Sequence, residues 1–147
     1  MLVNTSAESA FACAVARDLA GNISSTATRN VTIDRTAPNS PTITVDDNVG
    51  SLTGSLLSGT RTDDANLTVR VSLVGSGAMA GDSVQLFNGT ATLGTAVTLT
   101  AGDIGNGFIN IPTGALTDGT SYTINAKVID AAGNSSTASS NMSVTVD

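Results

Sequence analysis

Two stretches of this chain occur twice, far apart in the sequence. The turn "RDLAGNISST" at residues 17–26 returns as "IDAAGNSST" at 129–137, and "VTID" at 31–34 returns as "VTVD" at 144–147. The interval from Asp18 to Asp130 matches the interval from Asp34 to Asp147, except for a slip of one position. A period of roughly 110 residues is too long for a solenoid unit and is typical of whole domains in series.

The period predicts the domain organisation. We expect residues 35–147 to form one complete repeat, and residues 1–34 to supply the last strands of a preceding partial repeat and the start of a linker. The stretch "DRTAPNSP" at 34–41 is typical of a linker. Its two prolines, Pro38 and Pro41, restrict the chain and favour extended conformations in the residues before them. The chain is therefore expected to be an excerpt of a tandem array.

Charge and composition exclude several classes of function. Only 12% of the residues are charged, acidic residues outnumber basic ones twelve to six, and histidine is absent. Because nucleic-acid binding needs clustered Lys and Arg, we expect no nucleic-acid partner. No apolar run approaches the roughly 18 residues of a membrane span, so we expect no membrane insertion. Without histidine a Ser-His-Asp or Cys-His arrangement cannot form, and we predict that the chain is not an enzyme.

The hydrophobic pattern predicts strands. In "LTVRVSLV" at 67–74 and "YTINAKVID" at 122–130, apolar and polar residues alternate, as in half-buried strands. Shorter candidates lie at 41–45, 83–87, 95–100, 108–112 and 142–146, with Gly- and Asp-rich turns at 88–90, 102–107 and 117–121. No window shows helical periodicity. About seven antiparallel strands at this spacing predict an all-β, immunoglobulin-like β-sandwich.

A tyrosine supports this fold class. In "ALTDGTSY" at 115–122, an apolar residue and a turn lead to Tyr122 at the start of the next-to-last strand. Immunoglobulin-like sandwiches place a tyrosine near this corner, with its hydroxyl bonded back to the backbone a few residues upstream. We therefore expect a tyrosine corner at Tyr122.

Five stretches together resemble a known family. "VTIDRTAPNSPTIT", "DDNVGSLTGSLLSGTRTDD", "LFNGTATLGTAVTLT", "ALTDGTSY" and "DAAGNSST" are similar to the bacterial Ig-like repeats of Bap-type and other type I-secreted, biofilm-associated surface adhesins. The resemblance covers residues 31–147 and, more loosely, 11–30. It implies an extracellular spacer repeat at the bacterial cell surface, involved in attachment or biofilm formation. Its partners would be neighbouring Ig-like repeats of the same chain.

The resemblance also implies calcium, which stiffens such stalks at domain junctions. Ca²⁺ takes six to eight oxygen ligands, so aspartates near the ends of the sandwich are the candidates. The sandwich topology predicts Asp130 near Asp34 at the pole where the linker joins. At the opposite pole we expect four further candidates close to the final residue: Asp46, Asp47, Asp63 and Asp64. The alternative is that these side chains cap turns and keep the surface soluble.

Two further functions stay open at this stage. A module that binds a glycan, a host receptor or ice would show an exposed aromatic or flat Thr-rich patch. A filament subunit would use residues 1–34 for strand donation and self-association, because orphan strands expose unpaired edges that recruit partners.

Overall fold

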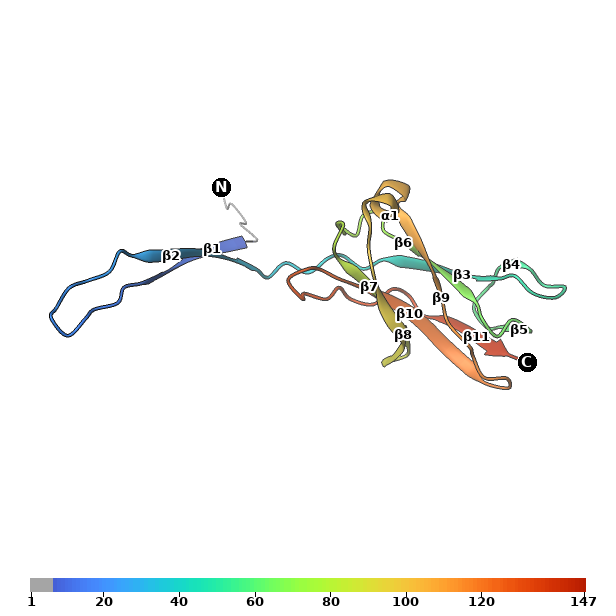
Figure 1. Cartoon of the computed structure of the whole chain (residues 1–147). Coiled ribbons are helices and arrows are strands. Elements are labelled where there is room, and N and C mark those ends of the chain that lie inside the picture. The colour runs from blue at the N-terminus through green and yellow to red at the C-terminus, as the bar shows by residue number, and fades with distance from the viewer. Residues whose placement is uncertain (1–6) are drawn as a thin grey trace. The chain divides into compact units, whose positions relative to one another are not determined.

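The computed structural model describes residues 7–147 and divides the chain into two compact units. The first unit ends at Thr36, and the second spans Ala37–Asp147 (Figure 1). The division thus lies at the proline-bearing stretch of the sequence, between Thr36 and Ala37.

The second unit is a β-sandwich. Within the described residues, one sheet has five strands in the order β5-β11-β10-β7-β8, and the other has four in the order β4-β3-β6-β9 (Figure 1). The strands are β3 (Thr42–Asp47), β4 (Gly54–Ser55), β5 (Thr60–Thr62), β6 (Thr68–Ser72), β7 (Ser83–Asn88), β8 (Ala91–Thr98), β9 (Phe108–Pro112), β10 (Ser121–Ile129) and β11 (Met142–Val146). The predicted all-β, immunoglobulin-like sandwich is confirmed.

Alternation along the strands builds the core. Apolar residues at every second position of β6 and β10 point between the sheets, because successive side chains of a strand face opposite ways. The buried set along these strands is Leu67, Val69, Val71, Leu73, Ile124, Ala126 and Val128. Burial of one such aliphatic side chain contributes about 1.5–3 kcal/mol. The faces predicted from the sequence are the faces that the core uses.

Strand register aligns the core side chains in rows. β6 lies between β3 and β9, so that Val69 is paired with Val45 on one side and with Ile111 on the other. All three side chains are buried. A slip of one residue would turn every apolar side chain of β6 to solvent, so burial fixes this register.

Two short strands escaped the sequence prediction. β4 and β5 have two and three residues, too few for a periodic pattern. Between them the chain changes sheets, and β5 then runs beside β11 in the same direction, from Thr60 opposite Val144 to Thr62 opposite Val146. The strands predicted from the sequence pair antiparallel as expected, and the one parallel pair of the sandwich involves β5, which was not predicted.

The predicted turn at 102–107 contains a short helix, α1 (Ala101–Asn106). Thr100 and Asp103 form a capping box, in which each side chain accepts a hydrogen bond from the other's backbone N–H. Gly107 ends the helix in the left-handed conformation at φ 76°. A single turn is too short to show helical periodicity, so its caps were the available signal.

The tyrosine corner is confirmed. The backbone N–H of Thr117 donates to the Tyr122 hydroxyl at 2.8 Å. This bond ties the β9–β10 connection to the start of β10.

The first unit contains the hairpin of β1 (Ala7–Ala14) and β2 (Ala27–Asp34). Its register repeats that of β10 and β11. Ala10 is paired with Val31 as Tyr122 is with Val144, and the neighbouring pairs are related by the same sequence intervals. The two hairpins are thus equivalent in backbone as well as in sequence.

Candidate functional site

Two of the predicted aspartates meet at the pole formed by residues 48–53, 63–66 and 147, here named the C-terminal pole. Asp47 ends β3, and Asp64 follows β5, and both side chains are buried. Thr62 connects them: its hydroxyl donates to Asp47 Oδ2 and accepts from the backbone N–H of Asp64 at 3.0 Å. The structure therefore brings Asp47 and Asp64 into one hydrogen-bonded group.

These carboxylates cap the loops around them. Asp47 Oδ1 accepts from the Val49 backbone N–H at 2.8 Å. The Asp64 carboxylate accepts from the backbone N–H groups of Asn48 at 3.2 Å and Asn66 at 2.7 Å. Buried carboxylates require such partners, because an unpaired buried charge is costly. The bonds give the two aspartates the turn-capping role described by the alternative interpretation.

The other two candidates at this pole lie differently. Asp46 precedes Asp47 in β3, so its side chain points to the opposite face of the strand, and it is only partly buried. Asp63 is exposed, and its carboxylate lies against the backbone of Gly50. The four predicted aspartates are thus neighbours in the chain, but only Asp47 and Asp64 share hydrogen-bonding partners.

The last residue is fixed at the same pole. The Asp147 backbone N–H donates to the Thr62 carbonyl at 2.9 Å, and its carboxylate pairs with the Arg61 guanidinium at 2.6 Å. The position of Asp147 near the predicted aspartates is confirmed. Because both side chains of the ion pair are well exposed, the pair itself contributes little to stability.

At the opposite end, loops 73–82, 99–107 and 130–141 form what we name the linker pole. Here Asp130 accepts from the Asn134 backbone N–H through Oδ1 and from the Asn134 side-chain amide through Oδ2, both at 2.8 Å. These bonds hold the pKa of the Asp130 carboxyl below its usual range, and the side-chain bond from Asn134 has the largest effect. Asp34, its predicted neighbour, lies in the first unit, and their proximity stays a prediction.

The same turn stands in the first unit. Asp18 accepts from Asn22 through backbone N–H and side-chain amide at 2.9 and 2.8 Å, and its pKa is likewise lowered, mainly by the side-chain bond from Asn22. Gly21 and Gly133 have nearly equal positive φ, at 90° and 92°. Only glycine adopts this conformation without a steric penalty, which explains why both copies of the sequence keep it.

A buried aspartate at the linker pole was not predicted. Asp82 is buried just before β7, and it accepts from the backbone N–H groups of Met79 at 2.8 Å and Ala131 at 3.1 Å. It therefore joins the loop before β7 to the loop after β10. The available signal was an aspartate between a glycine and the first residue of a strand, a common capping position.

The linker is anchored at this pole by its second half. Asn39 donates its backbone N–H to the Ser76 carbonyl at 2.8 Å and its side-chain amide to the Gly75 carbonyl at 3.0 Å. The Ser40 hydroxyl donates to the Ala138 carbonyl at 2.9 Å, and Pro41 is buried. The chain therefore enters the sandwich along a fixed path.

Both poles also expose apolar side chains. Val49 and Leu52 are each 45% exposed at the C-terminal pole, and Val74 and Met79 are 81% and 68% exposed at the linker pole. Single exposed apolar residues are ordinary on a protein surface.

The described residues offer no preformed metal centre, since no three His, Cys, Asp or Glu side chains among them are placed to hold one ion. In the same part of the chain, no helix has the length and apolar character needed to cross a membrane.

Comparison with known families gives one finding. Residues 39–147 match the family model described as bacterial Ig-like domain. This segment covers most of the second unit and about three quarters of the chain. A search of curated proteins found no match.

Proposed function

Because this chain belongs to the bacterial Ig-like domain family, we propose that its second unit is a structural spacer repeat in the stalk of a bacterial cell-surface adhesin that acts in attachment or biofilm formation. Domains of this family are common in extracellular and surface proteins and are typically non-catalytic. The proposed work of the repeat is mechanical: it folds, persists outside the cell and holds its neighbours at a distance.

The observation that carries the proposal is the equivalence of the two hairpins. Both turns have the same hydrogen bonds from Asn to Asp, and both hairpins have the same strand register. Agreement at this level supports two copies of one domain type in series, with residues 1–34 as the end of the repeat before the linker.

The anchored linker supports a stalk rather than a loose chain of domains. Asn39 and Ser40 bond to loops of the linker pole, and Pro38 and Pro41 remove conformational freedom. A short linker held in this way acts as a semi-rigid joint, whereas a Gly/Ser tether leaves neighbouring domains free to reorient.

Calcium at the junction between repeats is part of the proposal. Asp47 and Asp64 are buried as well as bonded within their loop, so the exposed carboxylate of Asp63 would contribute from the C-terminal pole. Asp34 and Asp130 would contribute from the linker and the linker pole of the next repeat. Since Ca²⁺ takes six to eight oxygens, such a site is complete only when two repeats are joined.

Length measurements on defined arrays test the spacer proposal. Chains of two, four and six copies of residues 35–147 would be expressed and their maximum dimension measured by small-angle X-ray scattering. We expect the dimension to grow in proportion to the number of copies. Growth closer to the square root of that number, as in a flexible chain, would overturn the proposal.

A matched control separates the linker from the domains. Replacing Pro38, Asn39 and Pro41 by glycine in every copy leaves the number of domains unchanged but removes the proline restraint and the Asn39 side-chain bond. We expect shorter maximum dimensions for this array than for the original of equal copy number.

A further inference from the structure

The second unit shows what covers a hairpin of this type. β7 pairs with β10 from Ile124 to Ile129, and β5 runs along β11 from Val144 to Val146. Across the sandwich, the inward face of the hairpin packs on the four-stranded sheet. Ile124, Ala126, Val128 and Val144 are all completely buried as a result.

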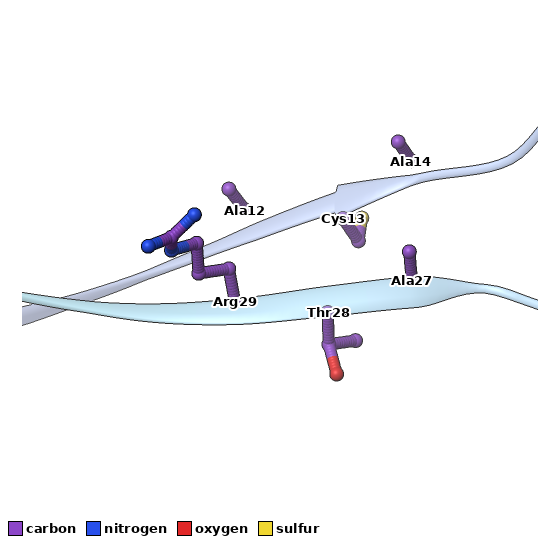
Figure 2. A pocket seen from close by; sticks show the side chains of 6 residues that line it. All are labelled: Ala12, Cys13, Ala14, Ala27, Thr28 and Arg29. Carbon is purple, nitrogen blue, oxygen red and sulfur yellow. The ribbon is translucent and has the colours of Figure 1, made fainter.

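In the first unit the equivalent face is open. Within the described residues, the sheet there consists of β1 and β2 alone. The counterparts of the buried residues are Ala12, Ala14, Ala16 and Val31, and all four are exposed. Figure 2 shows Ala12 and Ala14 on one side of the hairpin with Ala27 and Arg29, while Thr28 points to the other side. An isolated two-stranded hairpin is at best marginally stable in water.

We propose that β1–β2 is the closing hairpin of another bacterial Ig-like fold, and that its partner is the first seven strands of such a repeat, preceding it in the same polypeptide. A β7-like strand would pair antiparallel with residues 12–17, and a β5-like strand would run parallel to residues 31–33. This inference rests on the proposal of a tandem array and adds the register of the missing partner.

Side-chain size adds specificity to this pairing. The inward positions occupied by Ile124 and Val128 in β10 are occupied by Ala12 and Ala16 in the first hairpin. If the first hairpin replaced β10–β11 in the second unit, it would leave cavities at both positions. Such large-to-small changes in a core are strongly destabilising.

The partner of β1–β2 therefore has larger core side chains opposite these alanines than the second unit has. A second copy of this chain does not fit. Because of this difference in side-chain size, each hairpin fits the core of its own domain better than the core of a neighbouring repeat. Exchange of hairpins between adjacent domains is therefore disfavoured.

A composite chain tests the register and the size argument together. Residues 37–118 would be placed directly before residues 7–147, because position 119 of the second unit corresponds to position 7 of the first. This adds a first domain whose closing hairpin is β1–β2, and the full native chain from residue 7 follows. The measurement is hydrogen exchange of the peptide covering residues 7–17, read by mass spectrometry.

The variant Ala10→Tyr, Ala12→Ile, Ala16→Val and Arg29→Met restores the residues of the second unit at four inward positions. We expect its β1 amides to exchange at least about 100-fold more slowly than those of the composite with native alanines, since protected core amides exchange only through cooperative opening. The matched control Val15→Lys changes an outward position to the residue found at its counterpart, Lys127, and should leave exchange unchanged.

The outcomes are distinct. Rapid exchange in the restored variant would overturn the equivalence of the hairpins, and strong protection in the composite with native alanines would overturn the size argument. A domain-swapped dimer of the full native chain, measured by light scattering, would overturn the exclusion of a second copy. The length of arrays of residues 35–147 does not depend on β1–β2, so failure here is distinguishable from failure of the spacer proposal.

Discussion

Gly50 lies in the loop after β3 with φ of 72°, and a Cβ at this position would stand 2.0 Å from Asp63 Oδ2. We predict that Gly50→Ala is destabilising for two reasons, the left-handed backbone and the clash. The backbone alone costs about 1–2 kcal/mol in a residue with a Cβ. The matched control for the backbone cost is Gly89→Ala. Gly89 has φ of 62°, and no atom lies within 4 Å of the position that its Cβ would take. Urea unfolding would measure both variants.

The clash can be isolated by a second change. In the double variant Gly50→Ala with Asp63→Ala, the steric part is removed and the strain remains. We therefore expect its loss of stability to approach that of Gly89→Ala. Equal losses for the two single variants would contradict the close contact between Gly50 and Asp63.

The Tyr122 hydroxyl is a second test at this scale. Tyr122→Phe removes the acceptor of the Thr117 N–H and leaves the ring in place. We expect a loss of about 0.5–1.5 kcal/mol, the net contribution of an ordinary hydrogen bond. Thermal unfolding followed by circular dichroism would measure it. A midpoint equal to that of the native chain would mean that the corner bond does not stabilise the β9–β10 connection.

Two carboxyls of the second unit predict a pH dependence. Hydrogen bonds from the Asn134 side chain to Asp130 and from the Thr100 side chain to Asp103 lower both pKa values. A carboxyl whose pKa is lower in the folded than in the unfolded state stabilises the fold above its unfolded pKa, about 4. That stability is lost as the pH falls through the folded pKa.

We therefore predict that the unfolding free energy of the native chain decreases below about pH 4. In the double variant Asp103→Asn with Asp130→Asn, this decrease should be smaller. Urea unfolding at pH 7, 5, 4 and 3 would compare the two proteins. The native chain should be more stable at pH 7, and the difference should shrink toward pH 3. A difference that stays constant with pH would contradict the role of these two carboxyls.

At the scale of elements, the pairing of β5 with β11 is where tension on a stalk would act. The chain leaves the sandwich from β11, and backbone bonds flank the parallel pair, from Gly59 N–H to the Ser143 carbonyl at 2.7 Å and from Asp147 N–H to the Thr62 carbonyl at 2.9 Å. Pulling along β11 applies shear to all the hydrogen bonds between these two parallel strands at once. The bonds must therefore break together rather than one after another.

We predict that Arg61→Pro lowers the force needed to unfold the domain when it is stretched from its ends. Arg61 is paired with Thr145 in the middle of the parallel pair, and proline locks φ near −65°, away from the roughly −120° of a parallel strand. Arg61→Ala allows the extended backbone but removes the ion pair with Asp147, and should unfold near the native force. Equal forces for all three proteins, measured by single-molecule stretching, would place the mechanical resistance elsewhere.

The elements predicted from the sequence are those whose alternating pattern extends over enough residues to be recognised. β6 and β10 alternate over several residues, so both strands and their buried faces were predicted correctly. β4, β5 and α1 are each shorter than the pattern that would identify them, and β5 also depends on a partner far along the chain, with Val144 opposite Thr60. Local sequence contains no information on such a pairing.

The aspartates show the same limit at the candidate sites. Their concentration near the ends of strands predicted the two poles, but not which side chains share a hydrogen bond. Asp47 and Asp64 meet because Thr62 lies between them, and Thr62 is placed by its pairing with Val146. Asp82 contacts a loop 49 residues further along the chain, at Ala131.

At the scale of the whole molecule, the two recurring stretches predicted an array before any strand was assigned. A long-period repeat in the sequence indicates a repeated domain, whatever the secondary structure within it. The equivalent turns at Asp18 and Asp130 have the same hydrogen-bond geometry in both units. The two units share this backbone pattern but differ in the residues at the equivalent inward positions.

The junction between repeats makes a final prediction about calcium. A chain with two copies of residues 35–147 is predicted to contain a complete junction, with Asp63 and Asp147 of one copy near Asp130 of the next, because Asp147 stands at the position of Asp34 in the repeat. We expect it to unfold at a higher temperature in millimolar Ca²⁺ than in excess EDTA. A ligand at a hundredfold excess over its Kd adds about 2.7 kcal/mol to folded-state stability, which moves the midpoint of a domain this size by several degrees.

Two comparisons localise that effect. The single repeat contains only part of the junction, so calcium should raise its midpoint much less than that of the double repeat. In the double repeat, Asp63→Asn and Asp130→Asn should each reduce the calcium-dependent shift, whereas Asp118→Asn, at an exposed turn beside Val146 that lies at the same end but outside the predicted set, should leave it unchanged. Identical midpoints for the double repeat in calcium and in EDTA would exclude a tight junction site and leave a spacer whose rigidity depends on the linker and the apolar side chains of its poles.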